Sequence, residues 1–148
     1  MEIRRLSAGD LRVMEELLDL FAEVFQEPRT YGGARPSAAY QRELLGDDTF
    51  VALVAIARGK VVGGLAAYEL RKFEQERSEF YLYDLAVVDA HRRRGVATAL
   101  IESLKVVAAE RGGYVIFVQA DWQEEAPVAL YSKLGRREDV HHFDIAVE

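Results

Sequence analysis

Apolar residues recur every three or four positions in two long segments, which is the spacing of one face of an amphipathic helix. The first segment follows Ser7 and Asp10, which resemble a capping box, and it ends at Glu27-Pro28 because proline cannot continue a helix. The second begins near Gly95 and stops at Gly112-Gly113. The apolar positions are Leu11, Met14, Leu17, Leu18, Phe21, Val24 and Phe25, and then Val96, Leu100, Leu104, Val107 and Ala108. These patterns predict helices over about 11–26 and 95–111.

Shorter apolar runs predict strands. Thr49–Ala57 and Val61–Leu70 are joined by Arg58-Gly59-Lys60, which indicates a hairpin. Phe80–Val88 is apolar on both faces, as is typical of a central strand, and Tyr114–Ala120 predicts another buried strand. Because a helix separates these last two runs, a right-handed crossover should make them parallel neighbours.

The remaining segments predict smaller elements. A first strand is expected at 3–6, and a mobile loop runs from Tyr31 through Pro36. Ser37 can cap a short helix that ends near Leu45. Another short helix is expected from about Pro127 to Leu134, and a last strand from about Glu138 to Val147. The order of elements is α/β (α+β), with a mixed sheet in a single domain over 1–148.

Composition limits the classes of function. The chain has 148 residues, half of them hydrophobic, and no apolar run reaches the ~20 residues that span a bilayer. We see no basic and then apolar leader, and there is no cysteine, so we expect a cytoplasmic protein without disulfides. The lack of cysteine also excludes a cysteinyl acyl-enzyme and a thiolate metal site. A net charge of −6 disfavours nucleic acid and allows a cationic substrate, although many cytosolic proteins are mildly acidic.

The run His91-Arg92-Arg93-Arg94-Gly95-Val96-Ala97-Thr98 carries the strongest chemical signal. It lies between the strand 80–88 and the helix 95–111, so a glycine and three arginines surround a helix N-terminus. Unpaired N–H groups and the helix dipole favour an anion there, and Gly95 lets a ligand approach the backbone closely. This turn therefore predicts a phosphorylated cofactor, while the alternative for Arg93 and Arg94 is a solvated turn.

Two motifs resemble the GCN5-related N-acetyltransferases. Arg92-Arg93-Arg94-Gly95-Val96-Ala97 matches their Gln/Arg-x-x-Gly-x-Gly/Ala motif, and Ala129-Leu130-Tyr131-Ser132-Lys133-Leu134-Gly135 matches their second cofactor motif. Further stretches resemble the aminoglycoside 3-N-acetyltransferases of the gentamicin-modifying type. These are Leu18-Asp19-Leu20-Phe21, Lys72-Phe73-Glu74-Gln75, Tyr83-Asp84-Leu85-Ala86-Val87, Gln119-Ala120-Asp121 and His142-Phe143-Asp144-Ile145. The resemblance implies a mixed sheet of six to seven strands flanked by about four helices.

The resemblance also implies acetyl-CoA as donor, an amine as acceptor and direct attack in a ternary complex. By that resemblance, the turn from Arg92 to Thr98 holds the diphosphate of the cofactor. The backbone of Leu85, Ala86 and Val87 pairs with the pantetheine arm, and their side chains are core residues. Tyr131 matches the tyrosine that gives a proton to the leaving thiolate, and its alternative is an amphipathic aromatic at a helix end. A homodimer is expected by the same analogy.

An ammonium acceptor requires carboxylates, because a lysine-like amine with a pKa of ~10.4 is almost wholly protonated at neutral pH. Asp84 is the first candidate for binding the cation and taking its proton, since a charge inside an apolar strand is costly without a purpose. The alternative is that it caps a turn or pairs with an arginine. Asp121 follows the neighbouring strand at the same sheet edge, where ligands of α/β proteins bind. Further candidate substrate contacts are Glu124, Glu125, Glu79 and Asp144, although the first two are equally typical of a helix N-terminus.

Histidine gives no metal site. His141 and His142 are adjacent on a predicted strand, so they point to opposite faces, and His91 is expected to be a solvated turn residue.

Three functions remain open. The first is acetylation of the 3-amino group of an aminoglycoside, which confers antibiotic resistance. The second is acetylation of another amine, such as a polyamine or a peptide. The third is a non-catalytic acyl-CoA sensor with the same fold.

Overall fold

The computed structural model describes residues 1–148, which form two compact units, Met1–Val118 and Gln119–Glu148. The first unit contains one five-stranded sheet with the strand order β1-β2-β3-β4-β5. The strands are β1 (Glu2–Arg5), β2 (Phe50–Ala57), β3 (Lys60–Arg71), β4 (Ser78–Val87) and β5 (Gly113–Val118). The α/β fold class is therefore confirmed, although the sheet has fewer strands than the six to seven expected.

Strand pairing follows the sequence pattern closely. β1 to β4 are successively antiparallel, and β5 lies parallel to β4. Arg58 and Gly59 at the β2–β3 turn have φ angles of 52° and 76°, which is the backbone of a two-residue hairpin. The hairpin and the parallel crossover are both confirmed.

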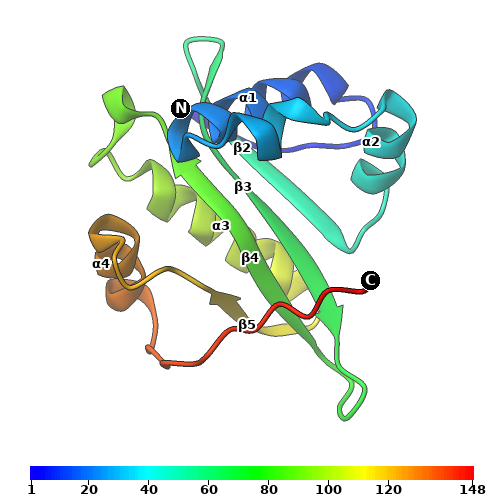
Figure 1. Ribbon diagram of the computed structural model, residues 1–148, viewed down its shortest axis with the longest axis vertical. Helices are drawn as coiled ribbons and strands as arrows, with labels where there is room; N and C mark the ends of the chain where they lie inside the picture. Colours follow the sequence, from blue (N-terminus) through cyan, green and yellow to red (C-terminus); the bar gives the residue numbers. More distant parts are fainter. The chain divides into compact units, whose positions relative to one another are not determined.

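Helices cover both faces of this sheet (Figure 1). α1 (Leu11–Phe25) and α2 (Ala38–Leu45) lie on one face, and α3 (Val96–Glu110) lies on the other. Two neighbouring glycines of β3 mark how closely the layers pack. A Cβ on Gly63 would lie 3.0 Å from Val96 of α3, and one on Gly64 would collide with Leu17 of α1.

Of the two helix caps expected at the start of α1 and α2, only the cap of α2 is formed as expected. Ser37 caps α2, since its Oγ accepts a hydrogen bond of 3.2 Å from the Tyr40 N–H. Asp10 precedes α1, but its carboxylate accepts bonds from the backbone and hydroxyl of Ser7 instead of from the helix. The link between α1 and α2 is also more regular than the expected loop, because Arg29–Gly33 forms a π-helical turn, η1.

β5 is less buried than its apolar sequence predicts. It lies at the edge of the sheet and pairs only with β4, and Tyr114 and Val115 are exposed. A strand with a neighbour on one side has less packed surface than a central strand, so the expectation of a fully buried strand here is wrong.

The second unit contains α4 (Glu125–Leu134), close to the expected helix. The strand expected from Glu138 to Val147 is absent, because residues 136–148 have no regular structure. A segment with alternating polar and apolar residues forms a strand only where a neighbouring strand satisfies its backbone hydrogen-bonding groups. Here the side chains make local ion pairs two residues apart, such as Arg137 with Asp139 at 2.8 Å. No helix of the chain has the length and apolar character needed to cross a bilayer.

Candidate active site

A β-bulge in β4 decides where Asp84 points. Asp84 pairs with Ala66 and Leu82 pairs with Ala67, so Tyr83 is an extra residue between them. Because Ala66 and Ala67 face opposite sides of the sheet, Leu82 and Asp84 also face opposite sides, although they are two positions apart. Leu82 is buried in the core, and Asp84 joins the face that α1 covers.

Asp84 has one partner from a distant segment. The Tyr31 hydroxyl, on η1, donates a hydrogen bond of 2.8 Å to Asp84 Oδ2. Burial raises the pKa of the Asp84 carboxyl, the bond from Tyr31 opposes this shift, and the nearby charge of Glu27 adds to it. Burial and the Asp84 carboxylate in turn raise the pKa of Tyr31, so its hydroxyl stays a proton donor.

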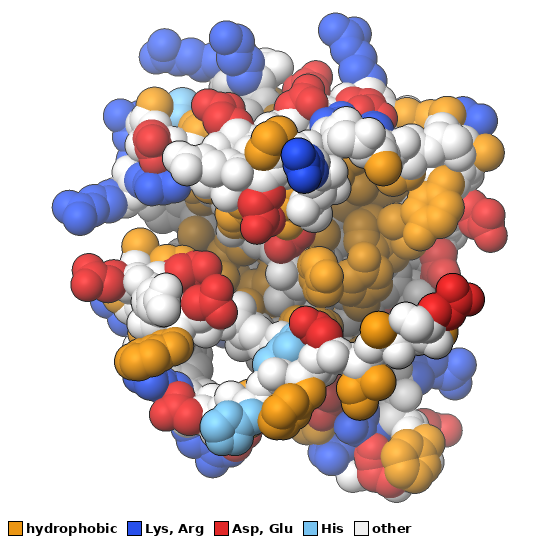
Figure 2. Space-filling view, viewed as in Figure 1, with side chains coloured by type: hydrophobic (Ala, Val, Ile, Leu, Met, Phe, Trp, Pro, Cys, Tyr) orange, Lys and Arg blue, Asp and Glu red, His pale blue; other side chains and the backbone are white.

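Aromatic rings extend from Asp84 across the same face. Tyr83 lies edge-on to Tyr68 and Tyr81, at centroid distances of 5.6 and 5.5 Å, and Tyr81 stacks on Phe117 at 4.6 Å. Tyr83 is 56% exposed and Tyr68 37% exposed. Figure 2 shows side chains of the hydrophobic class, in which tyrosine is counted, gathered over β3 and β4 on this face. A carboxylate beside exposed aromatic rings can bind a cation by charge and by cation–π contact.

The edge of β4 beyond Leu82 lacks a strand partner on one side. β5 pairs with β4 only from Ser78 to Leu82, whereas β3 pairs with β4 as far as Val87. Leu85, Ala86 and Val87 therefore have a strand neighbour on the β3 side alone. Backbone groups at such an edge can pair with an extended ligand.

The turn from Arg92 to Thr98, called the arginine–glycine turn below, has the backbone conformation of an anion site. Arg93 and Gly95 both adopt left-handed conformations, with φ of 61° and 78°, and Gly95 is the N-cap of α3. A side chain on Gly95 would meet no protein atom within 4 Å, so the space in front of the turn is open. The first amides of α3, at Val96, Ala97 and Thr98, have no acceptor within the helix. This arrangement fits the phosphate groups of a cofactor.

Arg92 is more constrained than its neighbours. Its guanidinium makes an ion pair of 2.9 Å with Asp89 and donates to the Val87 carbonyl at 3.3 Å. It lines a hollow of about 530 Å³ between the end of α1, at Glu23 and Gln26, and the residues that follow β4. Arg93 and Arg94 are exposed on the turn.

Glu79 lies on β4 but away from Asp84. Five residues of strand separate them by about 16 Å. Tyr114 donates a hydrogen bond of 2.6 Å to Glu79, and Lys72 lies 3.3 Å from it. The Tyr114 bond lowers the pKa of Glu79, and Lys72 adds to this effect. The structure thus gives Glu79 a place at the opposite end of β4.

The other predicted site residues belong to the second unit. Tyr131 is on α4, where its carbonyl accepts the Gly135 N–H at 2.9 Å. Glu124 and Glu125 form the N-terminus of α4, as the helix alternative for them predicts. Asp121 lies three residues after β5, which ends earlier than expected, and Asp144 pairs with His142 at 2.8 Å.

No group of three or more His, Asp or Glu side chains lies close enough to hold a metal ion. His91 lies on the arginine–glycine turn with its Nδ1 buried and without a hydrogen-bond partner.

Two residues of this region were missed from the sequence, Tyr31 and Arg35. Tyr31 contacts Asp84, and Arg35 bonds to the Tyr31 carbonyl at 2.8 Å. The available signal was Tyr31, an aromatic residue inside a glycine-containing connection where polar residues are expected; Arg35 carried no such signal.

Known proteins resemble this chain over most of its length. Residues 14–135 match the model of the acetyltransferase (GNAT) family. The crystal structure of an aminoglycoside acetyltransferase from an uncultured soil metagenomic sample is 60% identical, with a TM-score of 0.97, over 99% of this chain and 98% of that one. A second such enzyme from a soil metagenomic sample, in complex with sisomicin, is 30% identical, with a TM-score of 0.91, over 99% and 96% of the two chains.

Among curated proteins, N-acetyltransferase family 8 member 2 of Rattus norvegicus is 32% identical over 91 residues, or 61% of this chain. The chain spans about two fifths of the length of that relative, since the match covers 40% of it. The family match is broader, because it runs from within α1 to just past the end of α4. It therefore includes the arginine–glycine turn, the open edge of β4 and Asp84, and the chain belongs to the acetyltransferase (GNAT) family.

Proposed function

We propose that this chain transfers the acetyl group of acetyl-CoA to the 3-amino group of an aminoglycoside and so confers resistance. The observation that carries the proposal is Asp84, a desolvated carboxylate beside exposed aromatic rings. The similarity to soil aminoglycoside acetyltransferases, at 60% and 30% identity, supports the choice of acceptor.

Asp84 would bind the acceptor ammonium and take its proton, directly or through water. At neutral pH, deprotonating an amine with a lysine-like pKa costs roughly 1.36 kcal/mol per pKa unit, or about 4 to 5 kcal/mol. A partly buried carboxylate holds the ammonium in place, because its attraction for a cation is stronger at low dielectric, and it offers a base to accept the proton. Its raised pKa also brings its basicity closer to working pH.

The ring cluster favours a polycationic amino sugar over a peptide. Tyr68 and Tyr83 present aromatic surface to solvent next to a negative charge. Further ammonium groups could lie over these rings. Asp121, Glu124 and Glu125 are exposed carboxylates that would pair with other ammonium groups of the same acceptor.

Acetyl-CoA, when bound, supplies an activated thioester. The turn from Arg92 to Thr98 would hold its diphosphate, and the free edge of β4 at Leu85–Val87 would pair with its extended arm. Tyr131 would give a proton to the departing sulfur. Asp84 and Tyr131 thus have opposite tasks, since one accepts a proton from the amine and the other donates one.

The proposal is tested by release of free thiol from acetyl-CoA in the presence of gentamicin, sisomicin, kanamycin, spermidine or a lysine peptide. We expect turnover with the aminoglycosides, and NMR of the product should locate the acetyl group on the 3-amino nitrogen. Turnover with spermidine or the peptide alone would replace the aminoglycoside with another amine. Tight acetyl-CoA binding without turnover on any acceptor would indicate a sensor.

A further inference from the structure

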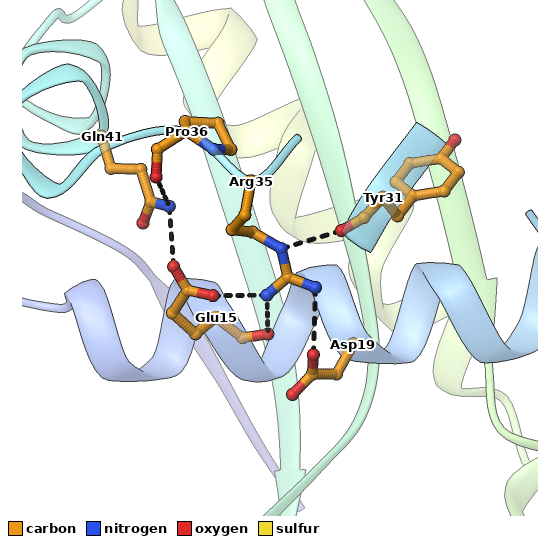
Figure 3. A network of polar contacts seen from close by, with 6 residues as sticks. All are labelled: Glu15, Asp19, Tyr31, Arg35, Pro36 and Gln41. Atoms are coloured by element: carbon orange, nitrogen blue, oxygen red, sulfur yellow. Dashed lines mark hydrogen bonds and ion pairs between the residues drawn. The ribbon is translucent and has the colours of Figure 1, made fainter. Parts of the chain in front are cut away.

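Arg35 joins the segment 29–36 to α1 (Figure 3). Its Nε donates to the Tyr31 carbonyl at 2.8 Å, and its Nη2 lies 3.1 Å from Asp19 Oδ1 on α1. Its Nη1 donates to the Glu15 carboxylate, one turn earlier on the same helix. The side chain is only 23% exposed. A guanidinium held in this way fixes both the position and the direction of the segment 29–36 against α1.

A second side chain reinforces the same contact from α2. Gln41 donates from Nε2 to Glu15 Oε1 at 2.8 Å and to the Pro36 carbonyl at 3.2 Å. Gln41 is 2% exposed, so its amide has no alternative partner in water. The bonds from Gln41 and Arg35 lower the pKa of Glu15, which keeps the partner of Arg35 charged.

The clamped segment carries the hydrogen-bond donor of Asp84. Arg35 holds the Tyr31 backbone, while the Tyr31 ring packs on Phe21 and Phe25 at centroid distances of 5.7 and 5.6 Å. With backbone and ring both fixed, the hydroxyl reaches Asp84 at 2.8 Å. The bond uses Oδ2, which leaves Oδ1 to bind the ammonium group of the amine substrate. Arg35 makes its hydrogen bonds and ion pairs with Tyr31, Glu15 and Asp19 and not with Asp84, so any influence on Asp84 passes through Tyr31.

We infer that Arg35 is a positioning residue for the acceptor site, which acts through Tyr31 on the charge state and direction of the Asp84 carboxylate. This inference rests on the proposed function only in naming Asp84 as the group that binds the acceptor. It assigns Tyr31 to the acceptor site. It also gives a role to the contacts by which Arg35, Glu15 and Gln41 hold the segment 29–36 against α1 and α2.

The pH dependence of Asp84 is set by a small group of neighbours. Tyr31 and Glu27 face it from the segment after α1, Tyr68 from β3, and Tyr81 and Tyr83 from its own strand. Of these, Tyr31 is the donor that favours the charged carboxylate. Loss of that bond should therefore raise the pKa of Asp84, by about one unit for a bond to a charged group.

The experiment compares Arg35→Gln, Tyr31→Phe and the double variant, with Arg35→Lys as a milder change should the first fail to fold. The matched control is Arg42→Gln, an exposed arginine on α2. Two quantities are measured for each: the pH profile of kcat/KM with the best amine acceptor, and the ¹³C NMR titration of the Asp84 carboxyl without substrate. The NMR signal is assigned with Asp84→Asn.

We expect Arg35→Gln and Tyr31→Phe each to raise the Asp84 pKa by about one unit, and to shift the acid limb of kcat/KM equally. The double variant should match Tyr31→Phe alone, because Arg35 acts through that residue. Arg35→Lys should restore part of the shift, and Arg42→Gln should show none.

Independent, additive effects of the two substitutions would overturn the inference, as would an unchanged Asp84 titration in Arg35→Gln. The proposed function fails separately, since the wild-type chain would then turn over no aminoglycoside while the NMR titration still tests Arg35.

Discussion

Tyr31 and Asp84 lie 53 residues apart in sequence, yet the Tyr31 hydroxyl hydrogen-bonds to Asp84 Oδ2 at 2.8 Å. The bond connects the turn after α1 to the bulged strand β4. It gives a partly buried carboxylate one neutral donor and no cation, which leaves its charge available to a cationic ligand.

Substituting Asp84→Asn should reduce kcat/KM for an aminoglycoside by at least about 100-fold, because both the charge and the proton acceptor are lost. The amide keeps the size of the carboxylate and can still accept from Tyr31. The Michaelis constant for acetyl-CoA should change little. Steady-state kinetics would check this, with Asp48→Asn as a control at an exposed aspartate; unchanged turnover in Asp84→Asn would remove it from the mechanism.

The same substitution should affect stability in a pH-dependent way. Burial raises the folded-state pKa of Asp84, so its stabilising contribution is complete below the unfolded pKa and is lost as the pH rises through the folded value. Asp84→Asn should therefore raise Tm by a few degrees relative to wild type near pH 7. Below about pH 3.5, where Asp84 is protonated in both the folded and the unfolded state, the difference in Tm should disappear. Thermal melts across this range provide the measurement, and a gain that is largest at low pH would contradict the assigned shift.

Tyr83 distinguishes a cation–π surface from simple packing. Tyr83→Leu should raise the Michaelis constant for gentamicin about two- to fivefold, since an exposed cation–π contact is worth about 0.5–1 kcal/mol. Tyr83→Phe keeps the ring and should stay near wild type. Equal effects of the two substitutions would show that the hydroxyl, rather than the ring face, matters.

Gly95 can be tested against a glycine with nearly the same φ angle. Gly95 has φ of 78° and Gly59, in the β2–β3 hairpin, has φ of 76°, and a Cβ at either would meet no protein atom within 4 Å. Alanine at each position should cost about 1–2 kcal/mol of stability through left-handed strain. Only Gly95→Ala should also weaken acetyl-CoA binding, because its methyl group enters the space in front of the α3 amides. Calorimetric titration with CoA measures this, and equal CoA affinities for the two variants would place the diphosphate elsewhere.

Tyr131→Phe should lower turnover while acetyl-CoA affinity stays the same. The substitution removes the proton donor proposed for the leaving sulfur and keeps the ring. Pre-steady-state thiol release and equilibrium CoA binding separate the two effects. A large loss of CoA binding with little further loss of rate would assign Tyr131 to packing.

The secondary structure of the first unit could be predicted from local pattern. The apolar spacing of α1 and α3, the Ser37 cap and the Arg58-Gly59 turn each depend on interactions within a few residues. In the tail 136–148, polar and apolar residues alternate as they do in strands, but the tail forms no strand. A strand also needs the backbone of a neighbouring strand, which the sequence pattern cannot supply.

The sequence by itself determined the α/β class, the turn at Arg92–Thr98 as a candidate anion site and Asp84 as a candidate catalytic residue, because helix termini, glycine conformations and a charge in an apolar strand are local properties. Only the tertiary structure decided which way Asp84 points, since one extra residue at Tyr83 moves it to the other face of β4. It also decided the partners of Asp84: Tyr31 and Arg35 come from a segment whose place depends on long-range contacts with α1. Side chains far apart in sequence meet only once packing has brought their elements together.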